Sequence, residues 1–135
     1  MKSFTIEATT TGLTQVLKFI DYELESLNCE IKVQYQIDVA VEEIYVNIVS
    51  YAYNGNKGNV TIEISSEVNP KSVTISFTDS GIPYNPLEKE DPDITLSAEE
   101  RSIGGLGIYM VKKSMDYVSY DYKDEKNIFS IKKYL

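Results

Sequence analysis

The chain has 135 residues, of which 42% are hydrophobic, so it is long enough to bury one continuous core without metals or disulfides. We therefore expect a single domain over residues 1–135. Thirteen basic and 21 acidic residues leave a formal net charge of −8, which argues against direct nucleic-acid binding because phosphates would be repelled. The sequence contains no run near the roughly 18 apolar residues of a membrane span, and its N-terminus lacks the apolar centre of a signal peptide. The expected location is the cytoplasm, without membrane contact.

Cysteine and histidine usage removes several kinds of chemistry. Cys29 is the only cysteine, and histidine is absent. The chain therefore has no internal disulfide, no thiolate zinc cluster and no Ser-His-Asp or Cys-His nucleophile system. We interpret Cys29 as a buried bystander. Any catalysis must use carboxylates, amides, lysines, hydroxyls and backbone groups.

The first half of the chain carries two helical and three strand patterns. Residues 4–8 alternate between apolar and polar and predict a short edge strand before a turn at 9–12. Apolar residues at steps of three and four predict one helix from Leu13 to about Asn28 and a second from about Ile37 to Tyr53. Runs of period two at 60–65 and 73–78 predict an antiparallel hairpin.

The second half begins with a long irregular stretch. Residues 82–103 contain three of the four prolines and predict a loop, with a capping-box pattern at 97–100. A helix is expected after residues 104–107, followed by strands at about 117–122 and 127–135. This order favours an α/β (α+β) two-layer sandwich, with helices on one face of a mixed, mostly antiparallel sheet.

Glu43 and Asn47 are the first candidate site residues. A four-residue step places both side chains on one face of the second helix. A carboxylate there can take a proton from a hydroxyl nucleophile, and an amide oxygen can ligate Mg²⁺. The alternative is an ordinary solvated helix face.

Asp79-Ser80-Gly81 follows the end of a strand pattern. A carboxylate at that place can accept a hydrogen bond from an exocyclic amine such as that of adenine. Gly81 would let the backbone approach a flat ligand closely. The same three residue types also make an ordinary turn.

The cluster Gly104-Gly105-Leu106-Gly107 holds three of the seven glycines just before a predicted helix. Backbone N–H groups at a helix N-terminus favour an anion such as phosphate, although a tight entry into a helix explains the glycines equally well. Arg101, the only arginine, can grip a phosphate or pair with Glu99 or Glu100. Since Asp79 follows Asn47 by 32 residues and Gly104 follows Gly81 by 23, we expect the three sites to converge on one pocket, with 82–103 as its lid.

In this order the motifs resemble the histidine-kinase-like (GHKL) ATPases and, within them, the anti-sigma factor serine/threonine kinases of the RsbW and SpoIIAB type. Residues 40–47 are similar to that family's N box, 79–81 to its first glycine box and 104–107 to its second. Residues 83–86 and 100–102 also resemble flanking stretches of this subgroup. The resemblance runs from about residue 4 to the end and implies the Bergerat fold.

The resemblance also implies a function. It implies an ATP-dependent protein kinase with Mg²⁺ as cofactor, Glu43 as general base, Asn47 as Mg²⁺ ligand and Asp79 as the adenine contact. The other implied nucleotide-binding residues are Gly81, Arg101, Gly104, Gly105, Leu106 and Gly107. The implied partners are an anti-anti-sigma-like protein that bears the phosphorylated serine and a sigma factor that the kinase sequesters; a homodimer is also implied.

Two positions depart from the family pattern. Tyr51 lies four residues after Asn47, at a position where many relatives carry His or Arg. The longer form of the first glycine box, Asp-x-Gly-x-Gly, has a second glycine where this chain has Pro83. Two alternatives therefore stay open. One is a nucleotide-gated binding module without phosphoryl transfer, and the other is an interaction domain that has lost the nucleotide.

Overall fold

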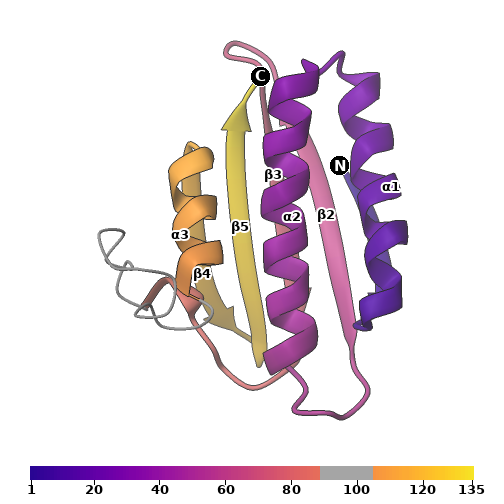
Figure 1. Ribbon diagram of the computed structural model, residues 1–135, viewed down its shortest axis with the longest axis vertical. Coiled ribbons are helices and arrows are strands. Elements are labelled where there is room, and N and C mark those ends of the chain that lie inside the picture. Colours follow the sequence, from indigo (N-terminus) through magenta and orange to yellow (C-terminus); the bar gives the residue numbers. More distant parts are fainter. Residues whose placement is uncertain (89–104) are drawn as a thin grey trace.

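The computed structural model describes residues 1–88 and 105–135, without the side chains of 105 and 106. Five strands form one sheet in the order β1-β2-β3-β5-β4 (Figure 1). The strands are β1 (Lys2–Glu7), β2 (Asn59–Glu67), β3 (Ser72–Asp79), β4 (Tyr117–Lys123) and β5 (Lys126–Tyr134). All four pairings are antiparallel, and β1 is the expected edge strand.

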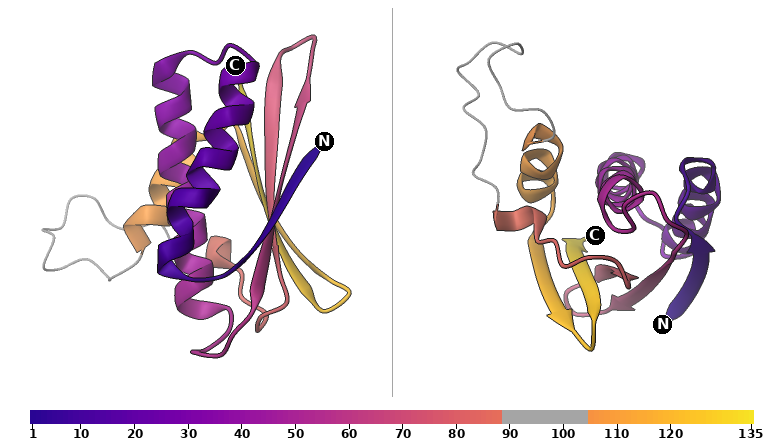
Figure 2. Two further views of the ribbon diagram at one scale, coloured as in Figure 1. Left: turned by 90° about the vertical axis from the view of Figure 1, so that its right-hand side faces the viewer. Right: turned by 90° about the horizontal axis from the view of Figure 1, so that it is seen from below.

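In the part of the chain that the structure describes, three α-helices cover one face of this sheet and none lies on the other face (Figure 2). They are α1 (Leu13–Ser26), α2 (Ile31–Tyr51) and α3 (Gly105–Ser114). The two-layer α+β sandwich predicted from the sequence is thereby confirmed. None of the helices in the described part of the chain is both long and apolar enough to cross a bilayer.

Helix α2 begins six residues earlier than its apolar periodicity predicts. The first turns contain Ile31 and Tyr35, which are 86% and 70% exposed, so their apolar side chains do not continue the buried stripe.

The loop expected at residues 82–103 is described only at its beginning. Residues 82–88 are described and include a 3₁₀ turn at Pro86–Glu88, whereas the capping-box pattern at 97–100 lies outside the described residues.

The rotation of α2 about its axis is fixed by Tyr45, which is fully buried. Its phenol donates to the Thr9 carbonyl at 2.6 Å and accepts from the Thr9 N–H at 3.2 Å. Gly12 packs against this phenol, and a Cβ there would meet the oxygen. Since Tyr45 faces the strand-to-α1 connection, Glu43 and Asn47 lie on the flank of α2 that faces α3.

The open face of the sheet is polar. Thr5 and Thr61 share a hydrogen bond of 2.9 Å across β1 and β2, and Ser76 and Ser130 share one of 2.9 Å across β3 and β5. The inward positions of the same strands carry Val, Ile and Phe side chains that meet the helices. This alternation follows the period-two pattern of the sequence and places the core in a single layer between sheet and helices.

Candidate functional site

A pocket lies where the ends of β3 and β5 meet the C-terminal half of α2. It contains about 430 Å³ of empty space, part of which opens to solvent at the mouth. Its wall is mostly apolar and includes Ile44, Ile48, Ala52, Ile82, Pro86, Ile108 and Phe129. Asn47, Asp79 and Asn127 add polar groups to this wall. An apolar cleft with a few convergent polar groups is typical of a small-molecule site.

Asp79 is the last residue of β3 and is 5% exposed. Its Oδ1 accepts the Gly81 N–H at 2.9 Å and the Asn127 Nδ2–H at 2.9 Å. Within the described part of the chain, no donor reaches Oδ2. A buried carboxylate is costly unless its oxygens are hydrogen-bonded, so the second oxygen is available to an N–H group of a ligand in the pocket.

Asn127 was missed by the sequence reasoning, although it stands directly opposite Asp79 in the β3–β5 register and is 5% exposed. Its Nδ2 also donates to the Ile82 carbonyl at 2.9 Å, and its Oδ1 accepts the Tyr84 N–H at 3.1 Å and the phenol of Tyr120. One amide therefore orients the Asp79 carboxylate and fixes the backbone after β3. One signal in the sequence could have revealed Asn127. In the period-two pattern of this strand, Asn127 occupies the same inward-facing positions as the apolar residues Phe129 and Ile131.

Aromatic rings complete the pocket wall. Tyr51 and Tyr84 pack with ring centroids 5.5 Å apart and an interplanar angle of 37°, and Tyr120 lines the same space. Burial raises the pKa of the Tyr120 phenol, which donates to the amide oxygen of Asn127. Flat aromatic side chains beside an apolar wall suit a planar ligand such as a purine. Tyr51, the departure from the family pattern, thus belongs to this wall.

Gly81 packs against the backbone of Ala52, and not against the open space of the pocket where a flat ligand was expected. A Cβ at this position would collide with the backbone carbonyl of Ala52 at the end of α2. The next residue, Ile82, donates its N–H to the same carbonyl at 2.9 Å. Gly81 therefore lets the segment after Asp79 cross the C-terminal end of α2, which sets the shape of the pocket floor.

Glu43 and the glycine cluster meet across α2 and α3. A Cβ on Gly107 would collide with the Glu43 carboxylate, so the missing side chain leaves room for it. Asn47, one helical turn from Glu43, lines the pocket. Asn47 and Asp79 therefore line the same pocket, whereas Glu43 and Gly107 contact each other but are not among the residues that line it.

Three predicted residues are placed only in part or not at all. Arg101 and Gly104 lie outside the described residues, and the side chain of Leu106 is not described. Gly105 is the first residue of α3, which puts the N-terminus of that helix beside Glu43. A helix N-terminus attracts anions through its unpaired N–H groups.

The residues present suit Mg²⁺ held jointly with phosphates. In the described ranges there is no group of three His, Cys, Asp or Glu side chains that could hold a metal alone. Mg²⁺ commonly takes one or two protein oxygens and fills its octahedron with phosphate and water. The Asn47 amide oxygen, which lines the pocket, supplies one donor of this kind.

The fold and the pocket define a class of protein, the two-layer α+β domains with a small-molecule site between helices and sheet. The family model described as "Histidine kinase-like ATPase domain" matches residues 6–133, and the chain belongs to this family. The GHKL assignment made from the three sequence motifs is thereby confirmed.

Two known proteins illustrate the relationship. The serine/threonine-protein kinase BtrW of Bordetella bronchiseptica is 22% identical over 122 residues, which cover 90% of this chain and 85% of that protein. The solved structure of the histidine kinase AdeS of Acinetobacter baumannii superposes with a TM-score of 0.51 at 14% identity, over 99% of this chain and 68% of that one. The second likeness supports the fold alone.

Proposed function

We propose that this protein is an ATP-dependent serine/threonine protein kinase that phosphorylates a partner regulatory protein and, like anti-sigma factors, sequesters a transcription regulator. The observation that carries the proposal is the pocket in which the buried carboxylate of Asp79 keeps one oxygen available beside aromatic walls. The similarity to a serine/threonine-protein kinase over 90% of the chain favours a protein hydroxyl as acceptor.

Each described residue has a distinct task in this proposal. Asp79 accepts a hydrogen bond from the exocyclic amine of adenine, and the tyrosine wall holds the purine ring. The N-terminus of α3, opened by Gly105 and Gly107, receives the phosphates. Asn47 holds Mg²⁺, which when bound neutralises charge on the phosphate oxygens. The roles of Arg101, Gly104 and Leu106 in phosphate binding stay predictions from the sequence.

Glu43 acts as the general base. Its carboxylate accepts the proton of the serine hydroxyl as the hydroxyl oxygen forms a bond to the γ-phosphorus, and the bond from that phosphorus to the β–γ bridging oxygen breaks. ADP leaves with the electron pair of that bond. Phosphoryl transfer depends mainly on positioning and charge neutralisation, so it needs no histidine.

Two measurements test the proposal. Fluorescent ADP, titrated with and without Mg²⁺, should bind saturably, and Asp79→Asn should weaken binding at least about tenfold because one carboxylate hydrogen bond is lost. The absence of saturable binding by the wild type would contradict both the kinase and the nucleotide-gated module.

The kinase step is tested separately with radiolabelled ATP and proteins that co-purify with the chain. Glu43→Ala should keep ADP affinity and lose phosphoserine formation by about a hundredfold or more. Glu42→Ala is the matched control because Glu42 is exposed on the same helix. Saturable nucleotide binding without phosphoserine in the wild type would favour the nucleotide-gated module.

A further inference from the structure

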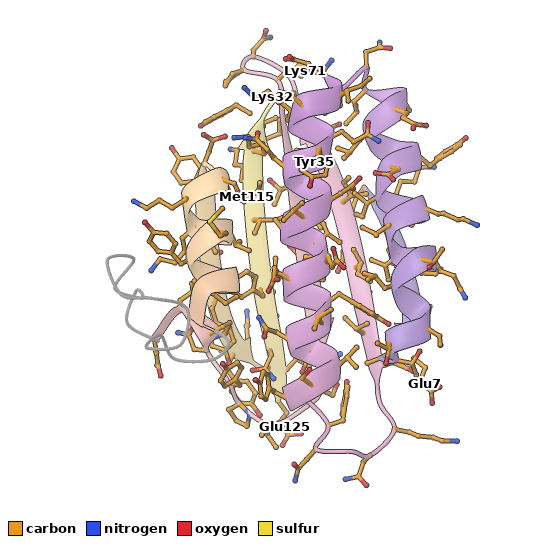
Figure 3. The ribbon with its side chains drawn as sticks, viewed as in Figure 1. Glu7, Lys32, Tyr35, Lys71, Met115 and Glu125 are labelled. Atoms are coloured by element: carbon orange, nitrogen blue, oxygen red, sulfur yellow. The ribbon has the colours of Figure 1, made fainter. Side chains whose placement is uncertain are left out.

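The connection between α2 and β2 carries a chemical group that neither the nucleotide pocket nor the proposed reaction uses. It joins Tyr51 to Asn59 and extends beyond the end of the sheet, at the end of the molecule where Glu125 is labelled (Figure 3). Asn54 and Gly55 lie in the middle of this connection, and both are exposed. Of the eight asparagines in the chain, Asn54 is the one that glycine follows.

An asparagine followed by glycine can lose its side-chain amide without an enzyme. The main-chain nitrogen of the glycine forms a bond to Cγ of the asparagine and gives up its proton, while the Cγ–Nδ2 bond breaks and ammonia leaves. Water then opens the cyclic imide on one side to aspartate and on the other to isoaspartate, so the net reaction consumes water and releases ammonia in equal amounts. Glycine favours the attack because it has no Cβ to obstruct ring closure.

The structure leaves both reacting groups free. Within the described part of the chain, neither the side-chain amide of Asn54 nor the N–H of Gly55 forms a hydrogen bond with protein. Gly55 has a φ of 85°, and a Cβ added to it would meet no atom within 4 Å. The attacking nitrogen and the amide therefore have open space around them.

The turn that contains these residues is weakly held. The hydrogen bond that closes it runs from the Asn56 N–H to the Tyr53 carbonyl at 2.9 Å. Ring closure requires the peptide plane between Asn54 and Gly55 to rotate, so the turn has to open first. An exposed hydrogen bond adds little net stability because water replaces it. We therefore expect the turn to open locally while the helices and the sheet stay folded.

The other asparagines lack one or more of these conditions. Asn69 and Asn85 precede prolines, whose nitrogen has no proton to give up. Asn127 is buried within β5, where the ladder to β3 holds its main chain. Asn56 lies in the same connection as Asn54, but the next residue, Lys57, brings a side chain against the ring. The remaining asparagines are also followed by residues with a side chain: Asn28, Asn47 and Asn59.

We propose that Asn54 is a site of non-enzymatic deamidation, at which the folded protein gains a carboxylate as aspartate or isoaspartate. The reaction needs water as its only co-reactant. It is therefore independent of the proposed nucleotide binding and phosphoryl transfer, and its test does not depend on either.

The isoaspartyl product changes the support of the segment that follows β3. It lengthens the main chain between residues 54 and 55 by a methylene group, directly after Tyr53. The Tyr53 phenol accepts the Ser80 N–H at 2.9 Å and donates to the Asn59 carbonyl. Gly58 packs against the Tyr53 ring, because a Cβ there would collide with it. A displacement of Tyr53 therefore reaches Ser80, which directly follows Asp79.

Incubation of the folded wild type in mildly alkaline buffer tests the site. Peptide mass spectrometry locates each amide that has become a carboxyl group, and labelling by an isoaspartyl methyltransferase identifies the isoaspartyl product. Conversion at Asn54 should exceed that at every other asparagine by at least about tenfold. Asn54→Gln should convert at least about tenfold more slowly, because the longer side chain closes a larger ring. Asn56→Gln is the matched control and should leave conversion at Asn54 unchanged.

The same incubation in urea separates the effect of the fold from that of the sequence. Asn54 of the unfolded chain should convert at a rate within about tenfold of that in the folded protein, since the turn opens locally. Conversion in urea with Asn54 intact in the folded protein would overturn the proposal, because the turn would then protect this residue. Equal conversion at Asn54 and Asn56 in the folded protein would overturn it as well.

The effect on Ser80 has its own measurement. Asn54→Asp carries the new carboxylate on an unaltered main chain, so it is the matched control for the isoaspartyl form. The amide signals of Ser80 and Asn59 in NMR spectra should shift more in the isoaspartyl fraction than in Asn54→Asp. Equal signals in the two proteins would contradict the link through Tyr53.

Discussion

Asn127 illustrates how much of the nucleotide pocket depends on one side chain. Its amide satisfies Asp79 Oδ1 and the Ile82 carbonyl, while its oxygen receives donors from Tyr84 and Tyr120. Because every polar atom of the amide is engaged with protein, Asn127 holds Asp79 in place and leaves the ligand contact to the Asp79 carboxylate.

Replacing Asn127 by Ala should therefore destabilise the protein as well as the site. The variant leaves buried donors and acceptors unpaired, and we expect a loss of about 1–3 kcal/mol in the free energy of unfolding, measured by urea titration. Tyr120→Phe removes a single hydrogen bond to the same amide and should cost about 1 kcal/mol. An Asn127→Ala protein that unfolds at the same urea concentration as the wild type would contradict this account of Asn127.

Gly107 offers a second test at the scale of one residue. A methyl group there would displace the Glu43 carboxylate, which is the flexible end of a side chain, whereas Ala favours helices over Gly by about 1 kcal/mol. Gly107→Ala should thus unfold no more easily than the wild type, yet form phosphoserine at least about tenfold more slowly.

Met110→Ala is the matched control for Gly107→Ala because Met110 lies on the same helix and is 51% exposed. It should retain phosphoryl transfer. A Gly107→Ala protein that transfers phosphate at the wild-type rate would show that the position of the Glu43 carboxylate does not matter.

At the scale of elements, α2 is the part of the fold that sequence reasoning described least well. From Ile37 onward, buried apolar residues recur at helical spacing and predict that part of the helix. Ile31 and Tyr35, in the turns before Ile37, are exposed and do not extend this spacing. The bounds of the strands were predicted more closely, because an alternation of apolar and polar residues can be recognised over only a few positions. Contacts between elements, such as Asp21 with Asp38 or Asp79 with Asn127, join positions far apart in the sequence and therefore leave no local pattern.

The contact between α1 and α2 makes stability depend on pH. The pKa of Asp38 is about 8 in the folded protein and near 4 in the unfolded chain, so the folded state binds more protons between these values. The free energy of unfolding should consequently fall as pH rises from about 4 to 8. The contribution of Asp38 is fully present below the lower value and is lost above the higher one.

Asp38→Asn removes this proton uptake and should therefore make the free energy of unfolding depend less on pH between about 4 and 8. Because part of the Asp38 side chain is open to solvent, we discount the effect to about 1–2 kcal/mol at pH 8, in favour of the variant. Urea unfolding of both proteins at several pH values measures the difference. Parallel profiles for wild type and variant would contradict the raised pKa.

At the scale of the whole molecule, the nucleotide pocket joins both layers of the sandwich. Ile48 of α2 and Ile108 of α3 belong to the helix layer, whereas Asp79 of β3 and Phe129 of β5 belong to the sheet. A ligand in this pocket contacts both layers at once, so its binding energy opposes their separation during unfolding. The order of the sequence motifs led us to expect a shared pocket, and Asn47 and Asp79 do line one pocket, but no motif indicated the tyrosine side chains beside them.

Nucleotide should for this reason stabilise the entire fold. At a concentration of about 100 times its Kd, a ligand that binds only the folded state adds about 2.7 kcal/mol, which raises the Tm by on the order of 10 °C for a chain of this size. ATP with Mg²⁺ should produce such a shift in differential scanning calorimetry, whereas GTP at the same concentration should not. Guanine carries a carbonyl oxygen where adenine carries its amine, so an acceptor would face the Asp79 carboxylate. Asp79→Asn removes that repulsion and should narrow the difference between the two nucleotides, while equal shifts by ATP and GTP in the wild type would mean that Asp79 does not read the base.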